Sequence, residues 1–143
     1  MRLIKVFIGF LTLLFICTSF TCSSKEKQAQ KHYLRGFEYH NQGLAEKAIE
    51  EYQKALKLNP SYIEAYMNIG AIYVDKKEYD QAIQQFKKVI ELNYYYGKAH
   101  YNLGMVYLYK GEKEKAQDEL KILRSMASGL ADNLEKKISE DSL

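Results

Sequence analysis

Cysteine is scarce in this chain of 143 residues and is confined to one end of it. The two cysteines are Cys17 and Cys22, and no other follows them. A disulfide in the region after Cys22 is therefore excluded, so helix packing must stabilise that region. The 13 tyrosines suit this role, because a large aromatic side chain buries about 150–250 Å².

An excess of charge of one sign is also missing. The chain has 21 Lys and Arg against 18 Asp and Glu, which is a formal net charge of +3. Arg2 and Lys5 supply two of these positive charges, so the sequence after them is nearly neutral. Proteins that bind nucleic acid usually present a clustered basic face. We therefore expect no nucleic-acid partner.

What the chain does contain is a repeat of 34 residues. Its three copies begin at Ala29, Ile63 and Gly97. Every copy has a glycine, a tyrosine and an alanine at equivalent offsets: Gly36, Gly70 and Gly104; Tyr39, Tyr73 and Tyr107; Ala48, Ala82 and Ala116. A fixed period of this length predicts a solenoid of stacked helix pairs rather than one closed globule.

The spacing of apolar residues supports a helix pair in each repeat. Residues 63–75 and 81–92 each carry apolar side chains at the i, i+3, i+4, i+7 positions of a helix face. The linker 75–78 is short and polar, so the two helices must pack antiparallel. Pro60 ends the first repeat, because proline lacks an N–H and clashes with the preceding turn. We place the repeats at residues 29–62, 63–96 and 97–130.

A further helix is predicted after the third repeat. Leu130, Leu134 and Ile138 fall at i, i+4, i+8 with polar residues around them. Residues 131–143 are therefore predicted as a capping helix and tail, which a terminal repeat needs for solubility. Gly129 is expected to end the preceding helix in a left-handed conformation. The Tyr94–Tyr96 run joins two repeats, where it packs between them or contacts a partner.

These residues resemble the tetratricopeptide repeat (TPR) family over residues 29 to about 130. Arg35 departs from the leucine of the family pattern, and only the first repeat has the closing proline. The resemblance implies an all-α, right-handed solenoid of three antiparallel helix pairs with a C-terminal capping helix. The matching residues of the second and third repeats are Tyr66, Ile69, Gly70, Tyr73, Ala82, Phe86 and Val89, then His100, Leu103, Gly104, Tyr107, Ala116, Leu120 and Leu123.

The N-terminus differs from the repeats. Two basic residues precede an apolar run at residues 6–17, and small polar residues follow it. This order predicts a secretory signal over residues 1–22. A retained membrane anchor is the alternative, although the run is shorter than the roughly 20 residues that span a bilayer. Cys22 is the predicted site of lipidation, with residues 23–28 as a polar tether, and Cys17 is the weaker candidate.

No catalytic or metal-binding pattern stands out. A Gly-rich phosphate loop, a nucleophile elbow and a zinc-protease helix motif are all missing from the sequence. His32 and His100 occupy the same repeat position, which favours a packing role over metal ligation, and His40 has no ligand at suitable spacing. Glu50–Glu51 and Glu112–Glu119 are predicted to face solvent and pair with lysines. We expect no enzymatic activity, metal or cofactor.

The resemblance instead implies a partner-binding groove, because the first helix of each TPR pair lines the concave face. Glu64 and Asp75 also fall at positions that point into the groove. The alternative to partner binding is that neighbouring helices or the N-terminal tether cover this lining. Such an apolar lining commonly marks an interaction site. The predicted groove residues are Tyr33, Phe37, His40 and Asn41; Met67, Asn68, Ala71 and Val74; and Lys98, Tyr101, Asn102, Met105, Leu108 and Tyr109.

One binding mode of the family can be compared residue by residue. Chaperone-type repeats hold a C-terminal carboxylate with five Lys, Asn and Arg side chains, of which this chain keeps Asn68 and Lys98. Tyr33, Phe37 and Asn102 replace the others. A carboxylate clamp is therefore not expected, and an apolar or aromatic segment fits better.

We interpret the chain as a membrane-anchored lipoprotein of the bacterial cell envelope that faces the periplasm or the cell exterior. Its predicted function is that of a non-enzymatic scaffold that binds an unidentified protein. A self-associating structural component, which makes a homo-oligomer, is one alternative. An adaptor that recruits an envelope hydrolase is the other.

Overall fold

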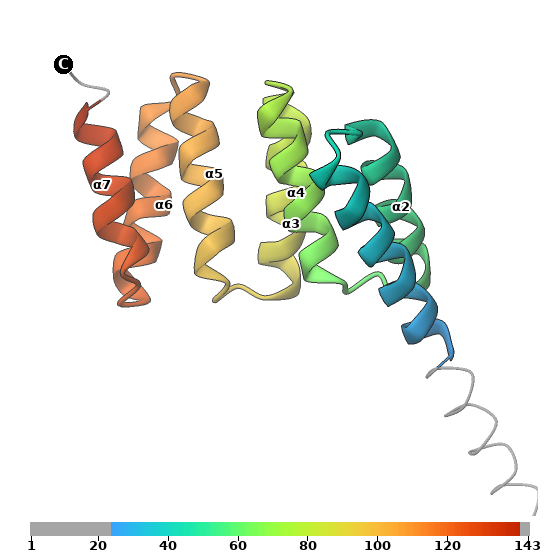
Figure 1. Ribbon diagram of the computed structural model, residues 1–143. Coiled ribbons are helices and arrows are strands. Elements are labelled where there is room, and N and C mark those ends of the chain that lie inside the picture. The colour runs from blue at the N-terminus through green and yellow to red at the C-terminus, as the bar shows by residue number, and fades with distance from the viewer. Residues whose placement is uncertain (1–23, 141–143) are drawn as a thin grey trace, which may run out of the picture. The chain divides into compact units, whose positions relative to one another are not determined.

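The computed structural model describes residues 24–140, and helices are the only regular elements among them (Figure 1). The predicted all-α fold is confirmed. The predicted signal or anchor, with Cys17 and Cys22, lies outside the described residues. Residues 24–41 form the first helix, and the others are α2 (Ala45–Leu58), α3 (Ile63–Asp75), α4 (Tyr79–Leu92), α5 (Gly97–Tyr109), α6 (Lys113–Ser125) and α7 (Leu130–Glu140).

The chain divides after Pro60 into two compact units. The N-terminal unit contains the first helix and α2, and the C-terminal unit contains α3 to α7. Residues 24–28, which the sequence predicts as a polar tether, are already helical. The helices α3 and α5 begin at Ile63 and Gly97, the first residues of the second and third predicted repeats.

In the N-terminal unit the two helices pack closely because small residues face a large ring. Ala29, Ala48 and Ala55 are fully buried, and so is the side chain of Tyr52. A Cβ atom added to Gly36 would lie 2.7 Å from the Tyr52 ring. The glycine is therefore required by this close approach.

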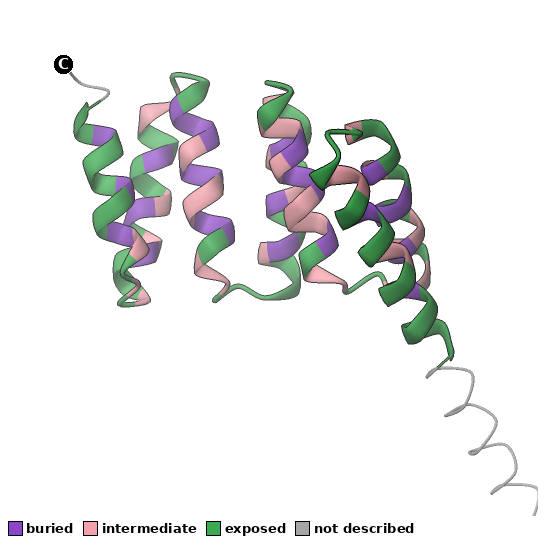
Figure 2. Cartoon of the chain, viewed as in Figure 1, coloured by how far each residue is buried: buried purple, intermediate pink, exposed green. Residues whose placement is uncertain are grey.

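In the C-terminal unit two glycines likewise allow a large side chain of another helix to approach closely. A Cβ atom at Gly70 would lie 2.5 Å from the Phe86 ring, and one at Gly104 would lie 2.6 Å from Leu134. Leu134 belongs to α7, which packs on both α5 and α6. The buried residues lie on the facing sides of these helices (Figure 2). Apolar members of this core include Phe86, Leu103, Val106, Leu108, Leu120, Leu123, Leu134 and Ile138.

The turns within the three repeats share one backbone conformation. Gly43, Lys77 and Gly111 occupy the same repeat position and have φ values of 73°, 60° and 72°. In each turn the next residue donates its N–H to the carbonyl five residues earlier, as in Glu78 to Tyr73 at 2.8 Å. This pattern closes a helix with a left-handed residue.

The predicted role of Gly129 is wrong. The helix α6 ends at Ser125, and Ala127 takes the left-handed conformation with φ of 50°. The Ser128 N–H then bonds the carbonyl of Leu123 at 3.1 Å. The chain reverses two residues before the glycine because α7 must begin at Leu130 to bury its apolar face.

Candidate functional site

The C-terminal unit contains an open pocket of about 260 Å³ between α3, α4 and α5. Seven of its lining side chains are apolar or aromatic, and Asp75 and Asn102 are the polar ones. Six predicted groove residues meet here: Ala71, Val74, Tyr101, Asn102, Met105 and Tyr109. Asp75, which the sequence places at an inward position, also lines the pocket, together with Phe86 and Val106.

Regular helix geometry explains why these residues meet. Tyr101, Met105 and Tyr109 are spaced by four residues, so they form one row along α5. Tyr109 is half-exposed, and its ring stacks on Tyr79 at 5.8 Å between centroids. This contact holds the last ring of the row in place, while buried Phe86 of α4 forms part of the lining.

Other predicted groove residues of this unit do not line the same pocket. Met67 is half-buried against the apolar core, and Lys98 is exposed on the first turn of α5. Asn68 is half-buried and is not among the lining residues. Leu108 lines a second hollow of about 480 Å³ with Met105, Tyr109, Lys137 and Glu140.

The N-terminal unit holds the remaining predicted groove residues. Tyr33 packs its ring 5.6 Å from the ring of Tyr52. Phe37 is 47% exposed, His40 is half-buried and Asn41 is exposed. Phe37 lines an open hollow whose residues all come from the first helix.

Two partly buried histidine–glutamate pairs were missed by sequence reasoning. His32 Nδ1 lies 2.7 Å from Glu51 Oε2, and His100 Nδ1 lies 2.6 Å from Glu119 Oε2. The prediction that both glutamates face solvent is therefore wrong. The signal was their spacing, since each histidine precedes its glutamate by 19 residues.

The imidazole of the third-repeat pair is hydrogen-bonded through both of its ring nitrogens. His100 is 1% exposed, and its Nε2 lies 2.9 Å from the backbone oxygen of Tyr94. A neutral imidazole has one N–H, yet both ring nitrogens here face oxygen atoms. Either an imidazolium donates to both oxygens, or Nε2 donates to Tyr94 while a protonated Glu119 donates to Nδ1. Both arrangements hold one proton more than a neutral histidine beside an ionised glutamate.

The two glutamates differ in acidity. Burial, the largest influence on Glu119, raises the pKa of its carboxyl group, and the hydrogen bond with His100 only partly offsets this. Burial also acts to raise the pKa of Glu51. There the hydrogen bonds and charges of Lys54 and His32 together outweigh burial, so the pKa of Glu51 lies below its ordinary value.

The Tyr94–Tyr96 run is not simply buried between repeats. Tyr95 is 78% exposed, while Tyr94 packs its ring edge-on against the His100 ring at 5.4 Å. Tyr94 is itself 51% exposed, so both side chains remain open to solvent.

The described residues contain neither a candidate metal site nor a candidate membrane span. Within residues 24–140, no group of three or more His, Cys, Asp or Glu side chains is placed to hold a metal ion. Every helix in this range is too short or too polar to cross a bilayer.

Comparison with known proteins adds family and fold. A TPR repeat model matches residues 36–77, and tetratricopeptide repeat models match residues 63–93 and 97–121. Over 54 residues the chain is 33% identical to the Hsp70-Hsp90 organising protein of Plasmodium falciparum (isolate 3D7). That alignment covers 38% of this chain and 10% of the curated relative, so the chain spans about a tenth of its length.

Two solved structures illustrate the similarity of fold. The N-terminal domain of stress-induced protein-1 (STI-1) from C. elegans has a TM-score of 0.73 and 24% identity, over 83% of this chain and 98% of that one. The first TPR of Spaghetti (RPAP3) bound to HSP90 peptide SRMEEVD has a TM-score of 0.71 and 23% identity, over 80% and 93%. At such identities the likeness establishes the fold alone.

Proposed function

Since this chain belongs to the tetratricopeptide repeat family, whose members are generally non-enzymatic scaffolds for protein–protein interaction, we propose that it binds a segment of another protein in the pocket between α3, α4 and α5. The carrying observation is that Tyr101, Met105 and Tyr109 converge there with apolar residues of α3. Aromatic anchors in such pockets often dominate binding energy, and methionine adapts to varied partner shapes.

The lining indicates the chemistry of the partner. No Lys or Arg is among the described residues that line the pocket, and Asp75 supplies a negative charge. An acidic peptide such as SRMEEVD, which the RPAP3 domain binds, would place like charges together here. We therefore infer an apolar or aromatic segment whose backbone N–H or cationic side chain meets Asp75. Asn102 can donate or accept a hydrogen bond with the backbone of an extended segment.

We further infer that the scaffold works in the bacterial cell envelope, held at a membrane through Cys22. The support is the order of the N-terminal sequence: basic residues, an apolar run, then a cysteine followed by polar residues. Two or more acyl chains anchor a protein stably, whereas one does so marginally. Metabolic labelling with an alkyne fatty acid tests this, because Cys22→Ser must abolish labelling. Labelling that survives in this variant but not in Cys17→Ser would move the site to Cys17.

The binding proposal is tested by crosslinking in living cells. A photoreactive amino acid at Met105 of the full-length protein records what touches the pocket. The comparison is between Tyr101→Ser and the matched Tyr95→Ser, which removes an exposed tyrosine outside the pocket. We expect Tyr101→Ser to weaken binding of the captured partner by at least about tenfold, as for an interface anchor, and Tyr95→Ser to leave it unchanged.

Two results would contradict the proposal. Equal capture by both variants, with both shown to be folded by circular dichroism, would place binding outside the pocket. Capture of a second copy of this chain alone, rising with its concentration, would favour the self-associating alternative.

A further inference from the structure

The first helix carries a row of cations that have no acidic partner within residues 24–140. Lys27, Lys31 and Arg35 are spaced by four residues and therefore share one side of the helix. Among residues 24–140 they form no ion pair, whereas Lys54, Lys110 and several other lysines do. Unpaired, exposed cations in a row suit a partner that presents many negative charges.

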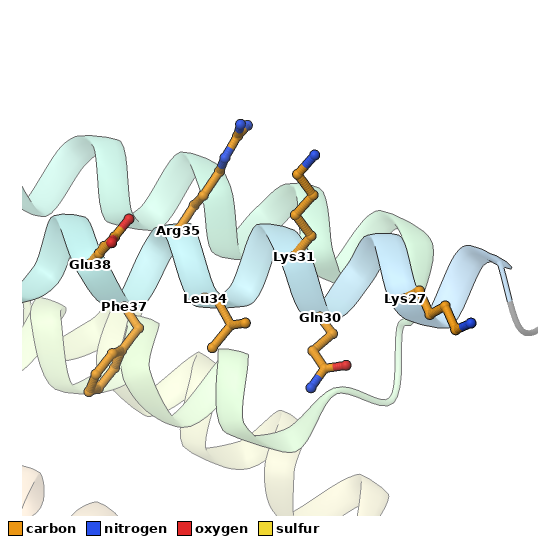
Figure 3. Close-up of a pocket in the computed structure, with 7 residues that line it drawn as sticks. All are labelled: Lys27, Gln30, Lys31, Leu34, Arg35, Phe37 and Glu38. Carbon is orange, nitrogen blue, oxygen red and sulfur yellow. The ribbon is translucent and has the colours of Figure 1, made fainter.

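Apolar side chains lie beside this row. Leu34 is 55% exposed and Phe37 is 47% exposed. In Figure 3, Lys31 and Arg35 point to one side of the helix, and Gln30, Leu34 and Phe37 point to the other. The hollow that these residues line is an open trough, because all seven lining residues come from this one helix. A helix that is basic on one flank and apolar on the other is typical of membrane-surface helices.

We propose that the helix of residues 24–41 binds an anionic lipid surface through Lys27, Lys31 and Arg35, with Leu34 of its apolar flank in contact with the lipid. This inference rests on the proposed attachment of the N-terminus to a membrane. With a rise of 1.5 Å per residue, Lys27 lies about 5 Å along the helix from Ser24, where the described residues begin, and Arg35 lies about 16 Å from it. Charge attraction fades beyond about 8 Å at physiological ionic strength. A helix lying along the surface brings all three cations within this range, and an upright helix does not.

A lipid surface explains the row better than a second copy of the chain. Glu38 is the only acidic side chain among the described residues that line the trough, so an identical face would bring cations against cations. An anionic bilayer instead offers negative charge along the whole row, next to the segment that is proposed to hold the chain there. Each cation near such a surface strengthens binding roughly fivefold, and three together by about a hundredfold.

The natural chain has no tryptophan, so one introduced tryptophan reports its own surroundings. Full-length Leu34→Trp is reconstituted into phosphatidylcholine vesicles with or without phosphatidylglycerol. Quenching by brominated lipid then measures contact with the membrane. We expect strong quenching only with phosphatidylglycerol, and its loss when salt is raised from about 0.1 M to 1 M, which shortens the screening length from about 10 Å to 3 Å.

Two variants that each lose three positive charges test whether Lys27, Lys31 and Arg35 in particular are needed for lipid contact. Lys27→Gln/Lys31→Gln/Arg35→Gln, made in the Leu34→Trp background, should abolish quenching of the introduced tryptophan. The control variant neutralises three other exposed lysines in the same background: Lys57, Lys87 and Lys121. This control should keep the quenching.

Flotation of the vesicles measures whether the protein is attached to the membrane at all. It therefore distinguishes a helix that does not contact lipid from an N-terminus that does not anchor the protein. Protein that floats with both kinds of vesicle but shows no lipid quenching would overturn the inference and leave the anchor intact. Equal quenching with both lipids would also overturn it, because apolar insertion alone would explain the contact. Protein that does not float at all would refute the membrane attachment itself and the inference with it.

Discussion

The first and third repeats place the same two residue types at the same two positions, yet the resulting pairs differ in charge behaviour. His32–Glu51 is partly open to solvent and includes Lys54, whose ammonium lies 2.7 Å from Glu51. His100–Glu119 is more deeply buried and instead bonds the Tyr94 carbonyl. The pKa of Glu51 is lowered and that of Glu119 is raised. Identical residue pairs thus acquire opposite acidity because burial dominates at Glu119, whereas Lys54 and His32 together outweigh burial at Glu51.

The third neighbour of each pair can be identified by its position in the repeat. Lys54 lies three residues after Glu51, and Ile122 lies three residues after Glu119. The middle repeat has neither half of the pair, since Tyr66 and Gln85 stand at the equivalent positions. The middle repeat therefore serves as a reference without the histidine–glutamate pair. Substitutions in the first or third repeat can introduce its residues at the same positions.

The largest difference between the two pairs should appear in the free energy of unfolding when the imidazole of each pair is removed in turn. His100→Phe leaves Glu119 and the Tyr94 carbonyl without their partner, so we expect a loss of about 2–3 kcal/mol in the free energy of unfolding. His32→Phe should cost about 1 kcal/mol, because solvent and Lys54 still reach Glu51. Urea unfolding near neutral pH measures both. Equal losses would mean that the difference in burial does not affect stability.

The pH dependence of stability should have opposite signs for the two pairs. Glu51 has a lowered pKa when folded, so its contribution is present above its unfolded pKa near 4.5 and is lost as pH falls through the folded pKa. Glu119 has a raised pKa when folded. Its contribution is therefore present below about pH 4.5 and is lost as pH rises through the folded pKa.

Conversion to the middle-repeat residues tests these signs. His32→Tyr/Glu51→Gln should remove the loss of stability on the acid side. His100→Tyr/Glu119→Gln should remove the loss that accompanies rising pH. The measurement is the free energy of unfolding from about pH 3 to 8. A pH profile unchanged by the third-repeat conversion would mean that the raised pKa of Glu119 does not contribute to the pH dependence of stability.

The turns provide a third comparison, in which the middle repeat differs. Lys77 holds the left-handed conformation that Gly43 and Gly111 hold elsewhere, and a side chain there is strained by about 1–2 kcal/mol. Lys77→Gly should stabilise the protein by only about 0.5–1 kcal/mol, because glycine also loses more freedom on folding. Gly111→Lys is the reverse control and should destabilise. Thermal unfolding of both variants measures the effect, and a loss of stability in Lys77→Gly would contradict it.

The smallest effect should come from exchange of the third neighbour alone. Ile122→Lys places an ammonium within reach of Glu119 and should lower the pKa of that carboxyl group, while Lys54→Ile should raise the pKa of Glu51. Side-chain carboxyl shifts in an NMR titration report each glutamate separately. If both pKa values stay where they are, burial rather than the third neighbour distinguishes the pairs.

Much of the fold followed from sequence because the repeat presents the same pattern three times. The 34-residue period predicted stacked helix pairs, and the close approach of Gly70 to the Phe86 ring explains why that position is a glycine. The sequence predicted Gly129 as the left-handed residue after α6, because glycine often takes this conformation at the end of a helix. In the structure Ala127 takes it instead, because the packing of α7 requires the chain to reverse there.

The candidate site was only partly predictable. The resemblance to the repeat family placed Tyr101, Met105 and Tyr109 at groove positions together with Ala71 and Val74 of α3, and the structure adds Phe86 and Val106 around them. Periodicity within one helix could not show that Glu51 and Glu119 turn toward histidines of another helix. Their burial depends on how two helices pack, and the stretches that contain them read as ordinary charged surface.

The sequence by itself determined the all-α repeat, because helical periodicity and the 34-residue spacing are properties of the chain alone. It also determined the near-neutral charge and the lack of cysteine after Cys22. Tertiary structure alone decided which apolar residues line an open pocket and which join the core. It alone decided the acidity of Glu51 and Glu119 as well, because burial and the third neighbour of a charge exist only once helices pack.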